Sequence, residues 1–132
     1  LNKAFQAKNS DKVEVFSVNH TRCFCYIDDA IEMLVRMMRN PECSGQVLNL
    51  GSQNPEVTMR DVAKTCFSVA NKSLIIQEKP ASPGSPERRA PNMELTKKLT
   101  NFSSKVDLHN GISQTYKWYK KYIFEGGNIS AL

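Results

Sequence analysis

The stretch Val13–Asp29 reads VEVFSVNHTRCFCYIDD, and the rest of the sequence can be arranged around it. Valine recurs at every second position of its first part, Val13–Phe16, as in a half-buried strand. Residues 17–21 supply Ser, Asn and Thr side chains, which favour a turn. Arg22 follows this turn and leads into residues 23–27, for which we predict a second short strand.

A helix is predicted to begin at the end of this stretch. Asp29 and Glu32 form a D-x-x-E pair, which can satisfy unpaired N–H groups in the first turn of a helix. The helix should reach about Arg39, because Asn40-Pro41 disfavours its continuation. Its apolar stripe repeats at helical spacing and consists of Ile31, Leu34, Val35 and Met38. We expect the methionines of this helix to fill the core.

The remaining elements are short and separated by turn residues. We expect helices over residues 1–8, 58–72, 92–100 and 108–124, and strands over residues 45–51 and 73–77. Thr58 and Asp61 form a second capping pair, Leu95 and Leu99 should face inward, and Gly126-Gly127 should end the last helix before a frayed terminus. These elements predict a small α/β fold with short strands and about four helices.

The composition limits the class of protein. The 132 residues suit one domain with one core, and no apolar run is long enough for a transmembrane span. No signal peptide is visible. The formal charge of +5 favours anionic partners such as nucleotides, but the basic residues are dispersed, so nucleic acid is the less expected partner. The first residue is Leu, from which we expect a fragment, a processed chain or a trimmed chain.

The four cysteines do not form a metal-binding pattern. The sequence contains no C-x-x-C, and His20 and His109 lack regular ligand spacing. Cys23 and Cys25 should face the same way on the predicted strand. We therefore expect no metal site, and reduced, mostly buried thiols in a cytoplasmic protein.

Three polar residues could either bind an anion or serve the fold. Arg88 and Arg89 lie in a proline-rich loop over residues 78–91. This loop is either an anion clamp, because guanidinium groups bind phosphate oxygens in a fork, or a solvated surface loop. Asn49 lies inside the apolar run of the predicted strand 45–51, where its amide either is satisfied within the sheet or points at a ligand.

The last predicted helix mixes aromatic and basic residues. One face carries Ile112, Tyr116, Tyr119 and Ile123, and other faces carry Lys117, Lys120 and Lys121. This pattern is typical of a core-packed amphipathic helix with a wet lysine face. A nucleic-acid surface, in which bases stack on aromatic rings, is the alternative.

The order of these features resembles the C-terminal part of extended short-chain dehydrogenase/reductase enzymes, the NAD-dependent nucleotide-sugar epimerases, dehydratases and decarboxylases. That family has Q-x-R, an aromatic stretch and Y-V-x-D where this chain has HTRCFCYIDD at His20–Asp29. The family's strand G-x-x-[FY]-N-[IL]-G and the Thr-capped helix after it are similar to Gly45–Gly51 and Thr58. Its R-x-P-D and closing L-x-x-G-[IL]-x-x-T-x-x-W-Y are similar to Arg89–Asn92 and Leu108–Tyr119. The resemblance covers nearly the whole chain and is nearest to UDP-glucuronate decarboxylases and to dehydratases of nucleoside-diphosphate sugars.

The resemblance implies that five residues bind a nucleoside-diphosphate sugar such as a UDP-sugar. Arg22, in the Q-x-R place, would bind the diphosphate, and Arg89, with its neighbour Arg88, would clamp it from the other side. Phe16 would lie beside the base, and Asn49 would be a polar contact near the phosphates. Two fixed guanidiniums suit the charge of a diphosphate.

Some family features are replaced or absent. The Gly-rich turn has become Ser17-Val18-Asn19, the Gln of Q-x-R is His20, and the acidic residue of R-x-P-D is Asn92. The NAD-binding turn G-x-x-G-x-x-G, where a phosphate rests on a helix N-terminus, is absent. Tyr116 and Lys120 form a Y-x-x-x-K pair, but the family's catalytic pair precedes the substrate motifs and this one follows them. We therefore assign no catalytic residue and no cofactor to this chain, and we assign NAD to a longer parent enzyme.

We accordingly expect residues 1–132 to be the substrate-binding part of an isomerase or lyase of this family, without its Rossmann domain. Without the N-terminal Rossmann domain, or a partner chain that supplies it, the chain should expose an apolar patch. We expect self-association to cover this patch. Two alternatives stay open: a non-catalytic binding or interaction module, and a basic nucleic-acid-binding domain.

Overall fold

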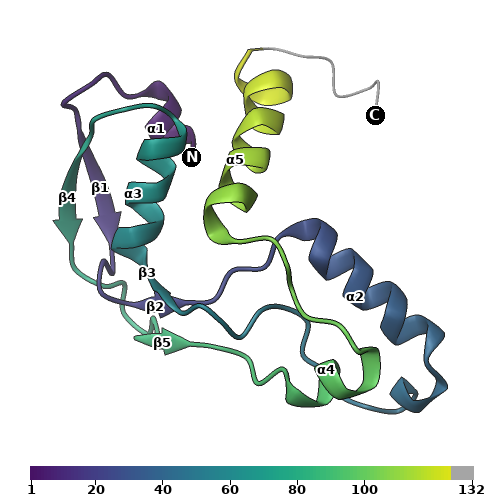
Figure 1. Cartoon of the computed structure of the whole chain (residues 1–132). Helices are drawn as coiled ribbons and strands as arrows, with labels where there is room; N and C mark the ends of the chain where they lie inside the picture. Colours follow the sequence, from purple (N-terminus) through teal and green to yellow (C-terminus); the bar gives the residue numbers. More distant parts are fainter. Residues whose placement is uncertain (126–132) are drawn as a thin grey trace.

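The computed structural model describes residues 1–125, which form the α/β fold that the sequence predicts (Figure 1). The α-helices of this part are α1 (Asn2–Gln6), α2 (Ile27–Arg39), α3 (Met59–Val69), α4 (Glu94–Thr100) and α5 (Leu108–Tyr119). Its strands are β1 (Lys12–Phe16), β2 (Thr21–Arg22), β3 (Val57–Thr58), β4 (Ile75–Lys79) and β5 (Arg88–Arg89). A 3₁₀ turn, η1 (Pro41–Cys43), follows α2, and a π-helical turn, η2 (Lys120–Phe124), extends α5.

The strands form two small sheets. β1 and β4 pair in parallel along their whole length, from Lys12 opposite Ile75 to Phe16 opposite Lys79. In the second sheet β2 lies between β3, which is antiparallel to it, and β5, which is parallel. In Figure 1 the first sheet and α3 lie at the left, α2 and α4 at the right, and α5 between them.

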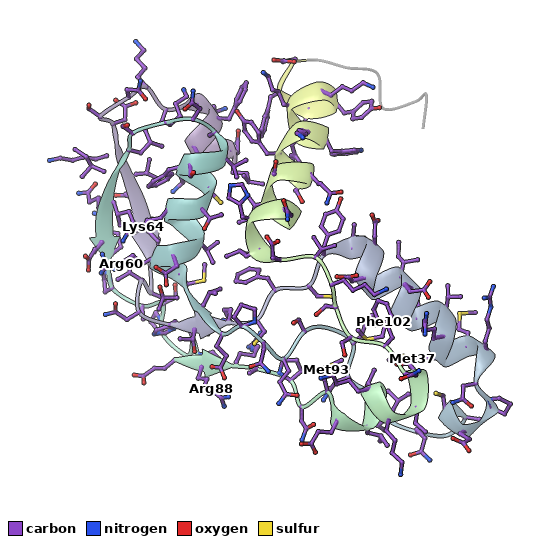
Figure 2. All side chains as sticks on the ribbon, viewed as in Figure 1. Met37, Arg60, Lys64, Arg88, Met93 and Phe102 are labelled. Carbon is purple, nitrogen blue, oxygen red and sulfur yellow. The ribbon has the colours of Figure 1, made fainter. Side chains whose placement is uncertain are left out.

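Two separate hydrophobic clusters stabilise the described part of the chain, whereas the sequence predicted a single core. The first cluster consists of Ala4, Val13, Phe67 and Ala70, with Tyr116 of α5 packed against it. The second consists of Met33, Met93 and Phe102, with Met37 packed against it. Figure 2 shows Met37, Met93 and Phe102 gathered between α2 and α4. The first cluster thus holds the parallel sheet to its helices, and the second holds α2 to α4.

The turn over residues 17–20, between β1 and β2, is hydrogen-bonded to the start of α3. The N–H of His20 donates to the carbonyl of Ser17 at 2.9 Å. The carbonyls of Val18 and His20 accept hydrogen bonds, both at 3.0 Å, from the first two N–H groups of α3. These N–H groups have no partner inside a helix, so the turn satisfies them. The predicted Thr58 cap of the same helix is also present, because its hydroxyl accepts from the N–H of Asp61.

Two predictions around the start of α2 are wrong. Residues 23–26 are irregular rather than a strand, because both neighbours of β2 are two residues long and no strand continues beside these residues. Asp29 does not cap α2. Its side chain is buried, and Oδ2 accepts hydrogen bonds from the N–H groups of Lys105 at 2.8 Å and Val106 at 2.9 Å. The carboxylate therefore ties α2 to the segment before α5.

The predicted apolar stripe of α2 faces solvent rather than the core. Ile31 and Met38 are 52% and 79% exposed, whereas Met33 is 1% exposed and Met37 packs beside it. Met33 and Met37 therefore fill the core as predicted, and Met38 does not. The predicted strand over residues 45–51 is also wrong, because none of the described strands pairs with it.

Other predicted core positions differ more locally. Leu95 is exposed and the neighbouring Thr96 is buried instead, so α4 packs a more polar face than expected. Tyr119 and Ile123 are also exposed, while Tyr116 packs inward as predicted. Gly126-Gly127 and the frayed terminus lie outside the described residues.

Three further observations concern residues 1–125. No helix there is both long enough and apolar enough to cross a membrane. No group of three His, Cys, Asp or Glu side chains in this part could hold a metal ion. All four cysteines are free thiols and are only partly buried, rather than mostly buried as predicted.

Candidate functional site

The second sheet brings the predicted basic residues together. β5 lies parallel beside β2, so that Arg22 is opposite Arg89 and Thr21 is opposite Arg88. Two segments that are far apart in the sequence thereby become neighbours through strands of two residues each. The predicted proximity of Arg22 to the arginine pair of the proline-rich loop is confirmed.

The guanidinium of Arg22 holds this loop in place. Its Nη1 donates to the carbonyls of Thr21 at 2.7 Å and Glu87 at 3.4 Å. Its Nη2 donates to the carbonyl of Pro86 at 2.8 Å and to the hydroxyl of Ser85 at 3.4 Å. A guanidinium has five N–H donors, so these bonds leave only the one on Nε. Arg22 therefore organises the loop before it contacts any ligand.

Arg88 is paired in a fork with Glu56 of the loop before β3. Its Nε donates to Oε2 at 2.8 Å and its Nη2 donates to Oε1, while the Thr21 hydroxyl donates to the same carboxylate at 3.3 Å. The hydrogen bond from Arg88 lowers the pKa of Glu56 below its ordinary value, and the same bond raises the pKa of Arg88. A phosphate would use the same fork, so it has to compete with Glu56.

Arg89 differs from its two neighbours. Its side chain is exposed, and no hydrogen bond or ion pair within residues 1–125 uses its guanidinium. Among the three arginines, Arg89 therefore has the donor fork that is ready for an anion.

An open hollow lies beyond the carboxyl ends of the two parallel strands. It is lined by Ser17, Asn19, His20, Lys79, Pro80 and Glu87. Phe16 ends β1 next to this hollow, and its side chain is 49% exposed. In α/β folds, ligands bind beyond the carboxyl ends of parallel strands. The Phe16 ring and the hollow therefore form a candidate surface for a nucleotide base.

The hollow is connected to the loop that Arg22 holds. The imidazole of His20 is buried, and its Nδ1 lies 3.5 Å from the Ser85 hydroxyl, which also accepts from Arg22. Glu87 lines the hollow and offers its carbonyl to Arg22. The hollow and the arginine-bearing strands thus share their supporting residues.

Asn49 does not join this group. Its side-chain nitrogen Nδ2 donates to the backbone carbonyl of Asn92 at 2.9 Å, and its backbone carbonyl accepts from the Thr96 hydroxyl at 2.7 Å. The side chain of Asn92 in turn accepts from the N–H of Glu94 at 2.9 Å. Asn49 therefore fixes its segment to the start of α4, and none of the recorded hydrogen bonds of residues 1–125 joins its amide to an arginine.

Sequence reasoning missed three residues that shape this site. Glu56, Ser85 and Lys79 contact or line it, but none was assigned a role, although Ser85 and Lys79 lie in the proline-rich loop whose arginines were singled out. Glu56 lies 32 positions from Arg88, and only the pairing of β2 with β3 and β5 brings the two together. The one signal in the sequence is an acidic residue two positions before the Thr58 cap.

No family model matches the sequence. Comparison with curated proteins, however, finds relatives of similar sequence. UDP-glucuronic acid decarboxylase 3 of Arabidopsis thaliana is 30% identical over 92 residues, which are 70% of this chain and 26% of that protein. UDP-glucuronic acid decarboxylase 1 of Danio rerio is 30% identical over 129 residues, which are 96% of this chain and 30% of that protein.

The chain is homologous to these nucleotide-sugar decarboxylases. It spans between about a quarter and a third of the length of such relatives. These relatives are nucleotide-sugar decarboxylases by name, one of the enzyme classes that the motifs in the sequence indicated.

The fold of this homologue also matches solved structures. UDP-glucuronic acid 4-epimerase from Bacillus cereus, in complex with UDP-glucuronic acid and NAD, superposes with a TM-score of 0.74 at 24% identity. The match covers 83% of this chain and 35% of the epimerase chain. The chain therefore has the fold of the C-terminal portion of extended short-chain dehydrogenase/reductase enzymes, which confirms the predicted fold class.

Proposed function

We propose that this chain is the substrate-binding part of an NAD-dependent nucleotide-sugar epimerase, dehydratase or decarboxylase, and that it holds the nucleoside diphosphate of a UDP-sugar or a related nucleotide sugar. One observation carries the proposal. The parallel pairing of β2 with β5 sets Arg22 opposite Arg89, and residues His20 and Glu87, two positions before these arginines, line a hollow.

Each residue has a physical role in this proposal. The ring of Phe16 stacks on the base. Arg89 binds phosphate oxygens with a fork that none of residues 1–125 occupies. Arg22 keeps its bonds to the loop carbonyls and thereby positions Arg89. Arg88 exchanges Glu56 for a phosphate oxygen when the nucleotide is bound. Asn49 supports this region from the start of α4 rather than by direct contact.

The cofactor belongs to another part of the proposed enzyme. NAD would accept and return a hydride there, and this chain contributes no glycine-rich turn to bind it. The purified chain therefore binds the nucleotide without turning over a nucleotide sugar.

An NMR titration of the labelled chain with UDP, dTDP, GDP and NAD tests the proposal. We expect shifts at Phe16, Arg22 and Arg89 with one of the three nucleoside diphosphates and none with NAD. Arg89→Ala should weaken this binding about tenfold or more, because a charge-assisted pair with phosphate is lost. Lys98→Ala, on the exposed side of α4, is the matched control and should bind as the native chain does. Absence of shifts with every nucleotide, or unchanged binding by Arg89→Ala, would refute the proposal.

Internal bonds favour a second candidate function, a non-catalytic binding or interaction module. Arg22 and Arg88 are both occupied within the chain, and Ser17 stands where the family has a glycine-rich turn. In that case the native chain binds no nucleotide, while the double variant Ser17→Gly, Asn92→Asp restores binding in the same titration.

A further inference from the structure

The proline-rich loop between β4 and β5 contains two serines that are each followed by proline. They are Ser82, before Pro83, and Ser85, before Pro86. A proline has no N–H and favours extended backbone in the residue before it. Such a dipeptide suits the peptide cleft of a protein kinase that selects serine followed by proline. In Figure 1 the loop leads into β5, an edge strand of the second sheet.

The residues that follow the two serines differ. Ser85 has Arg88 at the third position after it, in the order Ser-Pro-Glu-Arg, whereas Ser82 has a serine there. Several proline-directed kinases also bind a basic side chain at this third position. Ser85 is half-buried, but Pro86, Glu87 and Arg88 are all exposed. The recognition pattern around Ser85 is therefore complete and lies on the surface of the described part of the chain.

The hydroxyl of Ser85 lies among nitrogen donors that hold it loosely. Nη2 of Arg22 donates to it at 3.4 Å, and Nδ1 of His20 lies 3.5 Å from it. Both distances are long for hydrogen bonds. The backbone N–H of Ser85 donates to the carbonyl of Ser82 at 3.0 Å, in a turn whose other residues are exposed. A small and weakly bonded group thus occupies a place that a guanidinium and an imidazole both face.

A phosphate on this hydroxyl would use these donors more fully. It carries about −1.5 to −2 charges at pH 7 and three strong acceptor oxygens, and it gains charge-assisted hydrogen bonds when it lies opposite arginines. Arg89, opposite Arg22 in the strand register, adds a fork that no residue of the described part occupies. We propose that Ser85 is a phosphorylation site, and that Arg22 and His20 hold its phosphate beside Arg89.

The phosphoryl group comes from ATP bound to a proline-directed protein kinase. The Ser85 oxygen forms a bond to the γ-phosphorus, and the bond from that phosphorus to the oxygen of the departing ADP breaks. The hydroxyl proton passes to the catalytic carboxylate of the kinase.

Phosphorylation also regulates the arginine site, a consequence that rests on the proposed function. The phosphate on Ser85 and the diphosphate of a nucleotide compete for the guanidinium of Arg89. Because both groups are anions, their mutual repulsion adds to this competition. The modified loop therefore closes the site to nucleotides from inside the chain.

Treatment of the full chain with a cyclin-dependent kinase and MgATP tests the modification. We expect tandem mass spectrometry to place a phosphate on Ser85. Pro86→Ala should abolish this phosphorylation, because it removes the proline that the kinase selects, whereas Pro83→Ala is the matched control and should keep it. Phosphorylation of Ser82 alone, of neither serine, or of Ser85 equally in both proline variants would overturn the inference.

A chain synthesised with phosphoserine at position 85 tests whether the phosphate is held. Its side-chain NMR signals of Arg22 and His20 should shift relative to the unmodified chain. Phosphoserine at position 82 is the control and should leave these signals where they are. Signals that stay in place with phosphate at position 85, or that move equally with phosphate at either position, would overturn the inference.

The nucleotide titration is then repeated on both phosphorylated chains. Phosphate at position 85 should weaken binding about tenfold or more, because it takes charge-assisted bonds from the nucleotide, and phosphate at position 82 should not. Equal affinity of the two chains would overturn the inference. A native chain that binds no nucleotide would refute the proposed function alone, because the phosphorylated position and the shifts of Arg22 and His20 are measured without nucleotide.

Discussion

Ser17 holds a backbone conformation that L-residues avoid. Its φ of 54° lies in the left-handed region, where a side chain costs about 1–2 kcal/mol relative to the usual conformations. The carbonyls on either side of residue 19 fix the conformation, because they accept from the first N–H groups of α3. The turn therefore keeps its shape at the expense of strain at one serine.

Ser17→Gly should stabilise the chain by about 0.5–1 kcal/mol, because glycine removes the Cβ penalty and loses part of the gain to backbone entropy. Urea denaturation measures the free energy of unfolding. Ser17→Ala keeps the Cβ and is the control, for which we expect no gain. Equal stability of the native chain and the glycine variant would mean that the turn stores no strain.

Glu56 makes the stability of the site region depend on pH. Arg88 holds the pKa of Glu56 below its ordinary value of 4.5. The stabilisation is therefore complete above about pH 4.5 and is lost as the pH falls through the lower pKa of the folded chain. At pH 6 the native chain should unfold at a higher urea concentration than Glu56→Gln, and this difference should shrink steadily below pH 4.5. The control is Glu87→Gln, next to Arg88 in sequence. A difference between the native chain and Glu56→Gln that stays constant with pH would contradict the ion pair of Glu56 with Arg88.

At the scale of elements, α2 shows how two faces of one helix differ in energy. Met33 is fully packed, whereas Met38 lies in the exposed stripe. Met33→Ala should cost about 2–5 kcal/mol, because it removes buried methylenes and leaves a cavity. Met38→Ala should change the free energy of unfolding by less than about 0.5 kcal/mol. Denaturation of the two variants compares the faces directly, and similar losses would mean that the stripe is covered in solution.

Elements with local signals could be predicted from the sequence, and elements with distant partners could not. The Thr58 cap and the alternation of Val13 and Val15 are encoded by neighbouring residues, and both are present. The strands β2 and β5 have two residues each, too few for a periodic pattern. Periodicity located the apolar stripe of α2, but it could not show that Ile31 and Met38 are exposed in the described residues.

The same limit applies to the candidate site. The sequence pointed to Arg22 and to the arginine pair of the proline-rich loop, and the parallel strands place them side by side. It could not show that Glu56 occupies the fork of Arg88, because that contact depends on the register of three strands.

At the scale of the whole molecule, the two hydrophobic clusters share no residue. They are linked through α5, whose Tyr116 packs on the first cluster, and through Asp29, which binds the segment before α5. Each cluster is small, so the two halves are expected to open as separate units.

Phe102→Ala should therefore accelerate hydrogen exchange in α2 and α4 while leaving β1 and α3 unchanged. Phe67→Ala is the reciprocal variant and should accelerate exchange in β1 and α3 alone. Native-state hydrogen exchange by mass spectrometry resolves the two halves. Uniform acceleration across the chain in either variant would show that the clusters unfold together.

The parallel pairing of β1 with β4 also determines when the molecule can fold during its synthesis. β1 has no strand beside it until β4 has been made. The hydrogen bond from Arg22 to Ser85 joins residues 63 positions apart, so it can form only after Ser85 has been synthesised. Closing a loop of that length is entropically costly, although the cost grows only slowly with further length. The first half of the chain can pair β2 with β3, but it leaves the ribosome with β1 unpaired, so the parallel sheet and the hollow beyond it form only after β4 has been made.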